Sequence, residues 1–460
     1  MAEEARGLDE SVEKMRRAGA TRPAIDSFSH YYRLLAEGET GLLPESEIEP
    51  ARDLQDAEQL PEAGQEGREA LDRTVVIKLN GGLGTSMGMT GAKSLIEAKD
   101  GLSFLDVIAR QVLEDRRRFD VRLPLVLMNS FRTRDESLTA LERHPDLPVD
   151  VPLDFVQGKV PKLRADDLRP VSWPDDPDLE WAPPGHGDLY TSLVSSGMLA
   201  ELLGHGYERA FVSNSDNLGA VVDPSIAAWV AREQPPFVME VADRTESDRK
   251  GGHIARRRDG GGLVLRETAQ TPDEDTDAFQ DIDRHRYFNA NSLWIDLRAL
   301  EQLMRERGNV LGLPMIVNRK SVDPSDSSSP EVIQLESAMG AAIAVFDGAA
   351  AIRVPRSRLV PVKTTDDLLA LRSDAYELSG DYRLRGRAPV IELDPDHFKL
   401  LRDFEQRFPH GPPSLKDCER LTVKGDVCFG RDVTVHGSVT VEQKGEEQQR
   451  IEDGAVLEPG

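Results

Sequence analysis

Apolar residues follow two alternating patterns between Thr74 and about Asp374. Short runs rich in β-branched residues predict strands, and runs with apolar positions three and four apart predict helices. The clearest predicted strands are Thr74–Leu79, Leu123–Met128, Arg209–Val212, Phe237–Val241, Ser292–Ile295 and Ala351–Val354. The predicted helices are Leu105–Arg118, Thr191–Leu203, Pro224–Arg232, Leu297–Arg307 and Gln334–Ile343. This alternation predicts an α/β domain built on a mostly parallel sheet.

The chain before this alternation has a different pattern. Residues 1 to about 70 are polar with helically spaced apolar positions, and Pro44 and Pro50 end that pattern. Residues 51–70 are acidic and predict a loosely packed connection. We expect this N-terminal segment to be a scaffold without chemistry of its own.

The C-terminal region contains a six-residue repeat. Apolar residues recur six apart in two series, Leu421, Val427, Val433 and Val439, and Val423, Phe429, Val435 and Val441. A strict period of six favours a short parallel β-helix, and the alternative is an antiparallel meander. The patterns together predict an N-terminal helical segment (1–70), an α/β domain (71–385) and a C-terminal domain with the hexapeptide repeat (386–460).

Composition narrows the possible partners and the cellular compartment. The 460 residues carry a formal net charge of −25. Because nucleic-acid binding requires a basic face, this charge argues against nucleic acid as a general partner. The two cysteines, Cys418 and Cys428, are too few for a disulfide framework or a four-cysteine zinc site. The acidic N-terminus has no apolar signal-peptide core, and no apolar run approaches the roughly 18 residues of a membrane span. We expect a cytoplasmic protein.

The stretch from Thr74 to Glu97 carries the strongest chemical signal. A predicted buried strand leads directly into a loop that contains Gly81, Gly82, Gly84, Gly88, Gly91 and then Lys93. Glycines let backbone N–H groups approach a phosphate, and the lysine adds a positive charge. The P-loop pattern fails because Ala92 precedes Lys93, and the dinucleotide fingerprint fails because Met87 stands at its third glycine. The remaining alternative is a glycine-rich hairpin or linker.

Two further candidates lie near predicted strand ends. Asp216 follows the run ending at Val212, where a carboxylate could hold magnesium or could cap a turn. His186 stands between two glycines in a turn before a predicted helix. A histidine there could meet a ligand or could be structural, and the motif alone leaves both possibilities open.

Five polar residues further along could recognise a phosphorylated sugar. Glu240 in a strand suits a sugar hydroxyl, and Lys250 in a glycine-rich turn suits a phosphate. Asn289 and Asn291 lie at strand spacing, where amides could bind hydroxyls or the sheet edge. Lys363 precedes a capped helix N-terminus, which attracts anions, although a solvated lysine is the simpler alternative.

The glycine-rich stretch, LNGGLGTSMGMTGAKSLIE, resembles the nucleotide loop of the eukaryotic-type UTP–glucose-1-phosphate uridylyltransferases. Ala92 stands where that family usually has proline. The resemblance extends in family order through APPGHGDLY, NSDNLG, EVADRTESDRKGG, FNANSLWIDL, PMIVNRK, QLESAMGAAI and VPVKTTDDLL. An ordered series of this kind is much more specific than one motif.

The resemblance implies a GT-A-like nucleotidyltransferase domain followed by a left-handed parallel β-helix. It implies transfer of UMP from UTP to glucose 1-phosphate with Mg²⁺, and a homo-oligomer through the β-helix is possible. The implied contacts to UTP and its metal fall on Leu79, Asn80, Gly81, Gly82, Lys93, Gln157 (uracil), Gly185, Asn214 (ribose) and Asp216 (metal). The implied contacts to glucose 1-phosphate and to phosphate oxygens fall on His186, Glu240, Lys250, Asn289, Asn291 and Lys363. Lys93 and Lys363 are the implied catalytic residues.

Three alternatives remain at this point. The substrate could be another sugar phosphate, as in broad UDP-sugar pyrophosphorylases or UDP-N-acetylhexosamine pyrophosphorylases. The latter typically have arginine at the position of Ser86, so Ser86 and the FNANSLW motif favour glucose. The third alternative is a non-catalytic nucleotide-binding scaffold, and the joint presence of Lys93, Asp216 and Lys363 argues against it.

Overall fold

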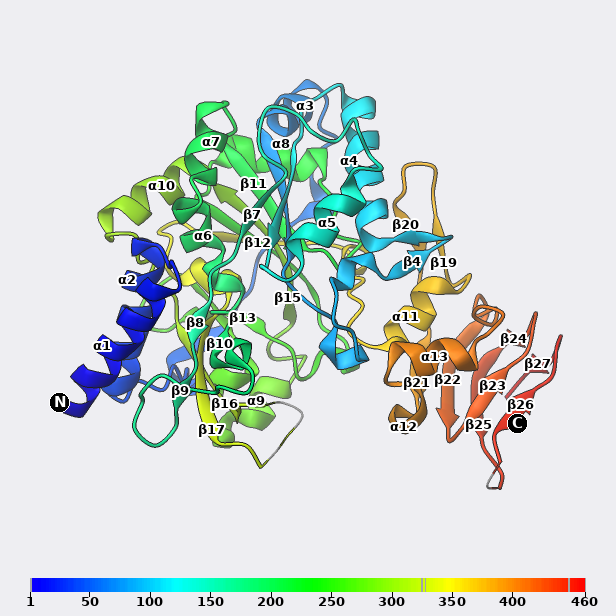
Figure 1. The fold of residues 1–460 in the computed structure, drawn as a ribbon. Coiled ribbons are helices and arrows are strands. Elements are labelled where there is room, and N and C mark those ends of the chain that lie inside the picture. Colours follow the sequence, from blue (N-terminus) through cyan, green and yellow to red (C-terminus); the bar gives the residue numbers. More distant parts are fainter. Residues whose placement is uncertain (1, 324–325, 327, 446, 460) are drawn as a thin grey trace.

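The centre of the molecule is a twisted sheet in which most neighbouring strands are parallel (Figure 1). The structure is a computed structural model that describes residues 2–323, 326, 328–445 and 447–459. The main path of the sheet is β2 (Gln55–Asp56), β18 (Ala350–Arg353), β12 (Phe237–Asp243), β15 (Tyr287–Asp296), β11 (Arg209–Asn214), β3 (Thr74–Asn80), β6 (Leu125–Asn129) and β7 (Asp154–Val156). Along this path only β15 runs antiparallel to its neighbours. The prediction of an α/β fold with a mostly parallel sheet is confirmed.

The central strands β3 and β11 are buried along almost their whole length because helices cover both faces of the sheet. On β3, Val76 packs into one apolar core while Val75 and Ile77 pack into the other. The first core includes residues of α3 (Gln65–Asp72), α4 (Phe104–Phe119), α5 (Arg134–Leu141), α8 (Pro224–Glu233) and α11 (Thr365–Arg372). The second includes residues of α6 (Leu189–Ser195), α7 (Met198–Gly204) and α10 (Leu297–Glu306).

Two of the predicted helices differ from the structure. The helix predicted over Thr191–Leu203 is two helices, α6 and α7, because Gly197 between them has a φ of +82°. The helix predicted over Gln334–Ile343 is wrong. Its first half is strand β17 (Glu331–Ser337), which pairs with β16 (Met315–Ser321) on one side and β9 (Leu163–Arg164) on the other. Its second half is a 3₁₀ turn (Met339–Ala344), so pairing on both sides of β17 outweighs the helical spacing.

The N-terminal segment begins with two helices and ends inside the α/β body. Phe28 and Tyr32 of α2 (Arg22–Ala36) pack on Ile333 and Leu335 of β17, and α1 (Ala2–Arg17) lies beside α2. Further on, β1 (Ile48–Pro50) pairs with the hairpin β13 (His253–Arg257) and β14 (Leu263–Arg266). Because β2 and α3 are also part of the body, residues 51–70 are better packed than the sequence predicted.

The C-terminal region forms a separate lobe of parallel strands, drawn in orange to red in Figure 1. Three strands, β21 (Val390–Leu393), β22 (Cys418–Lys424) and β25 (Gly437–Glu442), pair in parallel. Two further parallel pairs are β23 (Val427–Phe429) with β26 (Gln449–Ile451), and β24 (Thr434–Val435) with β27 (Val456–Leu457). Leu421 lies opposite Val439, three repeats later, and all eight residues of the two apolar series are buried. This pairing excludes the antiparallel meander.

The remaining helices and strands are mostly short. Within the body these are β4 (Glu97–Lys99), β5 (Leu102–Ser103), β8 (Val160–Pro161), β10 (Trp181–Ala182) and α9 (Thr276–Gln280). Towards the C-terminus they are β19 (Tyr376–Leu378), β20 (Leu384–Gly386), α12 (Pro395–Phe398) and α13 (Leu401–Arg407).

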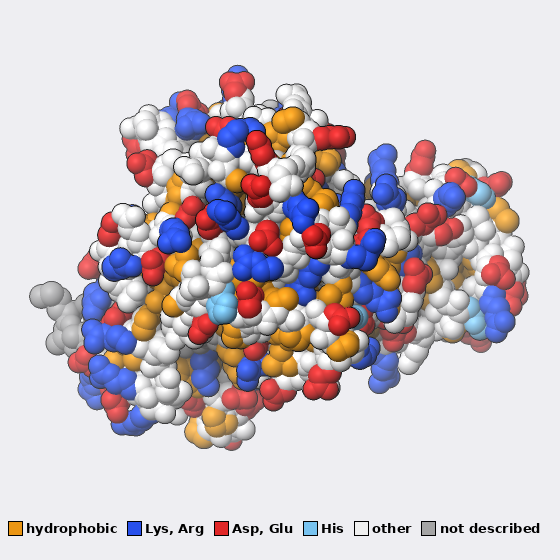
Figure 2. All heavy atoms as spheres, turned by 90° about the horizontal axis from the view of Figure 1, so that it is seen from above, with side chains coloured by type: hydrophobic (Ala, Val, Ile, Leu, Met, Phe, Trp, Pro, Cys, Tyr) orange, Lys and Arg blue, Asp and Glu red, His pale blue; other side chains and the backbone are white. Residues whose placement is uncertain are grey.

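The surface carries charges of both signs. On the face in Figure 2, acidic and basic side chains are interspersed over both the large body and the smaller lobe. Among the described helices, none has the length and apolar character that crossing a bilayer requires.

Candidate functional site

The carboxyl ends of β3, β6 and β7 meet at one edge of the sheet, where open α/β sheets bind ligands. The Asn80 amide donates to Asn129 Oδ1 at 2.8 Å, and the Gln157 backbone N–H donates to the Asn129 carbonyl at 2.8 Å. The Gln157 amide lies directly on Gly81, where a Cβ atom would come within 2.8 Å of Gln157 Nε2. Gly81 therefore lets the Gln157 side-chain amide lie against the backbone, and any side chain at position 81 would prevent this contact.

The glycine-rich loop returns to its own start. The Lys93 N–H donates to the Gly82 carbonyl at 3.0 Å, so the loop closes on itself. Gly84 and Gly88 bracket a short 3₁₀ turn with φ values of +63° and +74°. These values are unfavourable for other residues, so glycine is required at both positions. The neighbouring Leu79 carbonyl accepts from the Ser215 N–H at 3.1 Å and joins the loop to the end of β11.

Lys93 and Asp216 form the ionic centre of this edge. Lys93 Nζ lies 2.6 Å from Asp216 Oδ2, and the two side chains are 15% and 19% exposed. Asp216 Oδ1 is buried without a hydrogen-bond partner. A buried carboxylate oxygen without a partner is energetically costly, and a bound cation would satisfy it. In the described part of the chain no three His, Cys, Asp or Glu side chains are grouped to hold a metal, so Asp216 would need ligand oxygens from elsewhere.

His186 is held in a defined protonation state. Its Nδ1 accepts from the Met339 backbone N–H at 2.9 Å, so the proton of the neutral ring is on Nε2. Burial lowers the pKa of His186 to about 4, so the ring is neutral near pH 7. Gly185 precedes it with a φ of +78°, and a Cβ there would lie 2.4 Å from the Ser337 carbonyl. The turn therefore presents a neutral N–H donor.

Three asparagines from β11 and β15 are linked to one another. Asn291 Nδ2 donates to Asn214 Oδ1 at 3.1 Å, and the Asn291 backbone N–H donates to Asn289 Oδ1 at 2.8 Å. The register between β12 and β15 shifts at this point, and Asn291 has a φ of +55°. The regular alternation that the sequence predicted is therefore interrupted. Asn291 Oδ1 is buried without a partner, which leaves one acceptor for a ligand hydroxyl.

Glu240 does not have the environment that its predicted contact with glucose needs. Its side chain is fully buried, and both carboxylate oxygens accept from Arg358 at 2.7 and 2.9 Å. The Trp294 indole N–H also donates to it at 2.9 Å. The carboxylate is thus committed to the interior of the protein, which the sequence pattern of a strand residue could not indicate.

The two remaining predicted lysines are exposed at this end of the molecule. Lys363 directly follows Val362, whose N–H donates to the Asp216 carbonyl at 3.1 Å. Ser86 of the glycine-rich loop donates to the Lys363 carbonyl at 3.5 Å, so the loop and the lysine segment are in contact. Thr364 begins α11 with a capping box, as predicted. Lys250 lies in the turn before β13, where its carbonyl accepts from the Thr268 hydroxyl at 2.6 Å.

Two carboxylates near the site were not among the predicted residues. Glu267 follows β14, where burial raises its pKa against the opposing field of Lys363. It lies so close to Gly252 that a Cβ there would meet Oε2 at 2.4 Å. Asp188 lies two residues after His186 and binds the Gly158 N–H at 2.6 Å. Only the position of Asp188 beside the glycine–histidine turn could have indicated its importance from the sequence.

The fold and this edge of the sheet are typical of α/β proteins that bind phosphorylated ligands beyond the carboxyl ends of parallel strands. A family model described as UTP–glucose-1-phosphate uridylyltransferase matches residues 25–436. The enzyme of that name from Solanum tuberosum is 42% identical over 406 residues, covering 86% of this chain and 83% of its own. The one from Saccharomyces cerevisiae is 41% identical over 394 residues, covering 84% and 77%.

Solved structures agree with this assignment. A variant of UDP-glucose pyrophosphorylase from Leishmania major in complex with UDP-glucose superimposes with a TM-score of 0.93 at 45% identity, covering 99% of this chain and 98% of its own. A UDP-glucose phosphorylase structure from Trypanosoma brucei has a TM-score of 0.91 at 45% identity and 98% coverage of both chains. The chain belongs to the UTP–glucose-1-phosphate uridylyltransferase family, which confirms the resemblance noted in the sequence.

Proposed function

We propose that this protein transfers UMP from UTP to glucose 1-phosphate, forming UDP-glucose and releasing pyrophosphate. The observation that carries the proposal is the contact between Lys93 and Asp216 at the end of the glycine-rich loop. It places a cation and an incompletely satisfied carboxylate beside the backbone that would hold phosphates. The names of the relatives and the UDP-glucose bound to the Leishmania major neighbour support the same activity.

The architecture supports a division of the chain into three regions. We propose an N-terminal segment (1–70) that begins with two helices and ends within the α/β body, a GT-A-like catalytic domain (71–385) and a C-terminal domain (386–460). The three-repeat offset between paired strands supports a parallel β-helix with three repeats per coil in the last of these, and the family resemblance implies a left-handed one. Its exposed β21 and β27 edges leave room for a homo-oligomer through this domain.

The nucleotide would lie along the ends of β3, β7 and β11. Gln157 would hold the uracil through its side-chain amide, with Gly81 allowing the base to approach. Asn214 would contact the ribose, and Gly185 would lie against the nucleotide. The backbone from Leu79 to Gly82 would then direct the triphosphate toward Lys93. Asn80 would be one of the residues of this backbone segment that contact the nucleotide.

The transfer is an in-line displacement at the α-phosphorus of UTP. An anionic phosphate oxygen of glucose 1-phosphate forms the new P–O bond as the bond to the leaving pyrophosphate breaks. Because the attacking oxygen is already ionised, the step needs no general base. The protein's contribution is positioning and neutralisation of negative charge. Lys93 and Lys363 would carry that charge, and Lys250 would contact a phosphate at the rim.

The site fits a magnesium ion. The unpartnered Asp216 Oδ1 supplies one hard oxygen ligand, and Mg²⁺ usually takes one or two carboxylates together with substrate phosphates and water. When bound, the ion would draw phosphate oxygens together and withdraw charge from the reacting phosphorus. Lys93 would neutralise the phosphates from the opposite side of the same carboxylate.

The sugar phosphate would enter between the His186 turn and the asparagine cluster. His186 Nε2–H would donate to the phosphate as a neutral group. Asn289 and Asn291 would bind hydroxyls, the latter through its unpartnered Oδ1. Since both carboxylate oxygens of Glu240 bind Arg358, the half-buried carboxyl of Glu267 beside Gly252 is the better candidate for a hydroxyl contact.

A panel of sugar 1-phosphates tests the substrate assignment. UTP and magnesium would be held constant while glucose, galactose and N-acetylglucosamine 1-phosphates are offered separately, and pyrophosphate release would be followed. Release with glucose 1-phosphate at least about tenfold faster than with the others is expected. A preference for N-acetylglucosamine 1-phosphate would be consistent with the proposed mechanism but would contradict the assignment of glucose 1-phosphate as the substrate. No release with any of them would favour the non-catalytic scaffold.

A further inference from the structure

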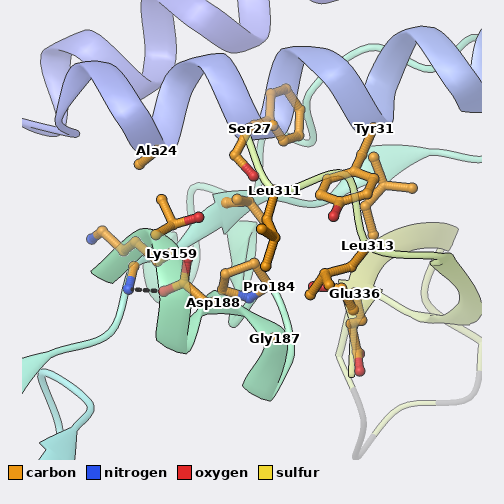
Figure 3. A pocket seen from close by; sticks show the side chains of 16 residues that line it. Ala24, Ser27, Tyr31, Lys159, Pro184, Gly187, Asp188, Leu311, Leu313 and Glu336 are labelled. Atoms are coloured by element: carbon orange, nitrogen blue, oxygen red, sulfur yellow. Dashed lines mark hydrogen bonds between the residues drawn. The ribbon is translucent and has the colours of Figure 1, made fainter. Parts of the chain in front are cut away.

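A small cavity lies between helix α2 and the two loops that would hold the substrates (Figure 3). Its volume of about 30 Å³ is enough for a water molecule or two. Tyr31 of α2 reaches one side of it, Asp188 and Lys159 the other, and Glu336 of β17 its end. The cavity therefore separates the N-terminal helices from the backs of the Gln157 loop and the His186 turn.

Asp188 is the side chain that joins these two loops. Its Oδ2 accepts from the Gly158 backbone N–H at 2.6 Å, the contact drawn as a dashed line in Figure 3. The same oxygen accepts from the Ser192 hydroxyl at 2.6 Å, which ties it to the first turn of α6. Gly158 adjoins Gln157, and Asp188 lies two residues after His186. One carboxylate oxygen thus connects the proposed uracil contact with the proposed sugar-phosphate contact.

Two successive backbone N–H groups of the Gln157 loop have acceptors on other segments of the chain. The Gln157 N–H is bound to the Asn129 carbonyl at 2.8 Å, and the next N–H, that of Gly158, is bound to Asp188. The two N–H groups belong to the peptide units before and after the Gln157 Cα atom, so together they restrain the backbone dihedral angles of Gln157. Those angles set the direction in which the Gln157 side chain leaves the backbone, and hence how its amide meets Gly81.

We propose that Asp188 is a positioning residue for UTP, acting through the Gly158 N–H to hold Gln157 in the orientation that receives the base. The inference rests on the proposed function and deepens it, since it assigns the control of nucleotide affinity to a buried carboxylate that would not touch the nucleotide. A charged acceptor strengthens such a hydrogen bond relative to a neutral one.

The charge on Asp188 changes with pH near the raised pKa of its carboxyl group. Burial raises its pKa to about 6, against the opposing effect of its bonds to Ser192 and Gly158. The facing groups are Tyr31, whose pKa burial raises to about 12, Glu336, Lys159 and, on its own turn, His186. The Lys159 ammonium lies 4.7 Å from the centre of the Trp181 ring. Asp188 is therefore ionised at pH 8 and becomes protonated below pH 6.

The test compares Asp188→Asn and Asp188→Ala with the wild type at pH 8. We expect the KM for UTP to rise about fivefold for asparagine, which keeps a neutral acceptor, and more than about tenfold for alanine. The value of kcat and the KM for glucose 1-phosphate should stay within about twofold. Ser192→Ala is the matched control, because it removes the other partner of the same oxygen and leaves the Gly158 contact in place.

A pH series separates positioning from a general structural role. The ratio of the UTP KM of Asp188→Asn to that of the wild type should fall towards one between pH 8 and pH 5.5, because the wild-type carboxylate becomes neutral. The titration of UTP itself cancels in this ratio. The melting temperature of Asp188→Asn at pH 8 should not fall, since a raised carboxyl pKa means that the ionised form destabilises the folded state.

Several results would overturn the inference. An unchanged UTP KM in both Asp188 variants would do so, as would a parallel loss of kcat, both KM values and thermal stability. Calorimetric titration with UTP alone keeps the two proposals distinguishable. Absence of pyrophosphate release by the wild type would count against the proposed function, whereas equal UTP affinity in wild type and Asp188→Ala would count against the role of Asp188.

Discussion

Lys93 Nζ lies 2.6 Å from Asp216 Oδ2, although the two residues are 123 positions apart in the chain. The pair links the end of the glycine-rich loop to the segment that follows β11. Asp216 uses one oxygen for this contact and leaves Oδ1 without a partner. A cation bound at Oδ1 would weaken the hold of Asp216 on Lys93, so metal and nucleotide would together redirect the lysine toward the phosphates.

Removing the charge of Lys93 tests this relationship. We expect Lys93→Ala to lower kcat by about a hundredfold or more, because a charge that stabilises the transition state is lost. Steady-state kinetics with both substrates saturating would measure it. Lys444→Ala removes the same charge from an exposed position in the C-terminal region and serves as the control. A kcat within threefold of the wild type in Lys93→Ala would contradict the assigned role.

His186→Ala should have a different kinetic signature. The lost N–H donor would mainly weaken sugar-phosphate binding, so the KM for glucose 1-phosphate should rise about tenfold, the typical value of a hydrogen bond to a charged group. The change in kcat should be much smaller than that of Lys93→Ala. Equal losses of kcat in the two variants, with KM unchanged, would show that this division of roles is wrong.

The protonation state of His186 predicts a pH dependence of stability. Its pKa is about 4 in the folded protein against about 6.5 for an unperturbed histidine, so the unfolded chain takes up the proton first. The contribution to stability is complete above pH 6.5 and is lost as the pH falls toward 4. Urea unfolding at pH 8, 6.5 and 5 should show the advantage of wild type over His186→Asn shrinking with acidity. An advantage that grows with acidity would indicate a charged histidine.

Glu240 is expected to affect stability rather than sugar binding. Breaking a buried ion pair by changing one partner typically lowers the free energy of unfolding by about 3–5 kcal/mol, and Glu240→Gln does this to Arg358. Glu246→Gln, which disrupts an exposed pair with Arg249, is the control and should have no measurable effect. Unchanged stability with a tenfold higher KM for glucose 1-phosphate would instead return Glu240 to the sugar pocket.

The sequence predicted those parts of the fold that local patterns determine. The buried strand at Thr74, its glycine-rich loop and the helix after Phe104 depend on residues close together in the chain, and they lie where expected. The C-terminal repeat was also readable, because each six-residue unit has the same apolar positions. The prediction was wrong where pairing with distant strands determines the secondary structure. Residues 334–337 were predicted to be helical, but they belong to β17, which pairs with β16 on one side and β9 on the other.

The site was predictable only in part for a related reason. The residues at the ends of β3 and β11 are brought together by parallel pairing, which the strand pattern implies. The environment of Glu240 depends on Arg358, which lies 118 positions further along the chain, and no local sequence pattern predicts that ion pair. Glu267 and Asp188 were missed because their importance arises from burial and from contacts with the backbone of distant glycines.

The proposed activity is magnesium-dependent uridylyl transfer to glucose 1-phosphate at the Lys93–Asp216 centre. The most direct measurement follows pyrophosphate and UDP-glucose together, with magnesium and with a chelator in excess. We expect the two products in a one-to-one ratio with magnesium and neither product without it. In Asp216→Asn we expect the same dependence, shifted to higher magnesium concentration. Full turnover in the presence of the chelator, or pyrophosphate released without UDP-glucose, would contradict the proposed activity.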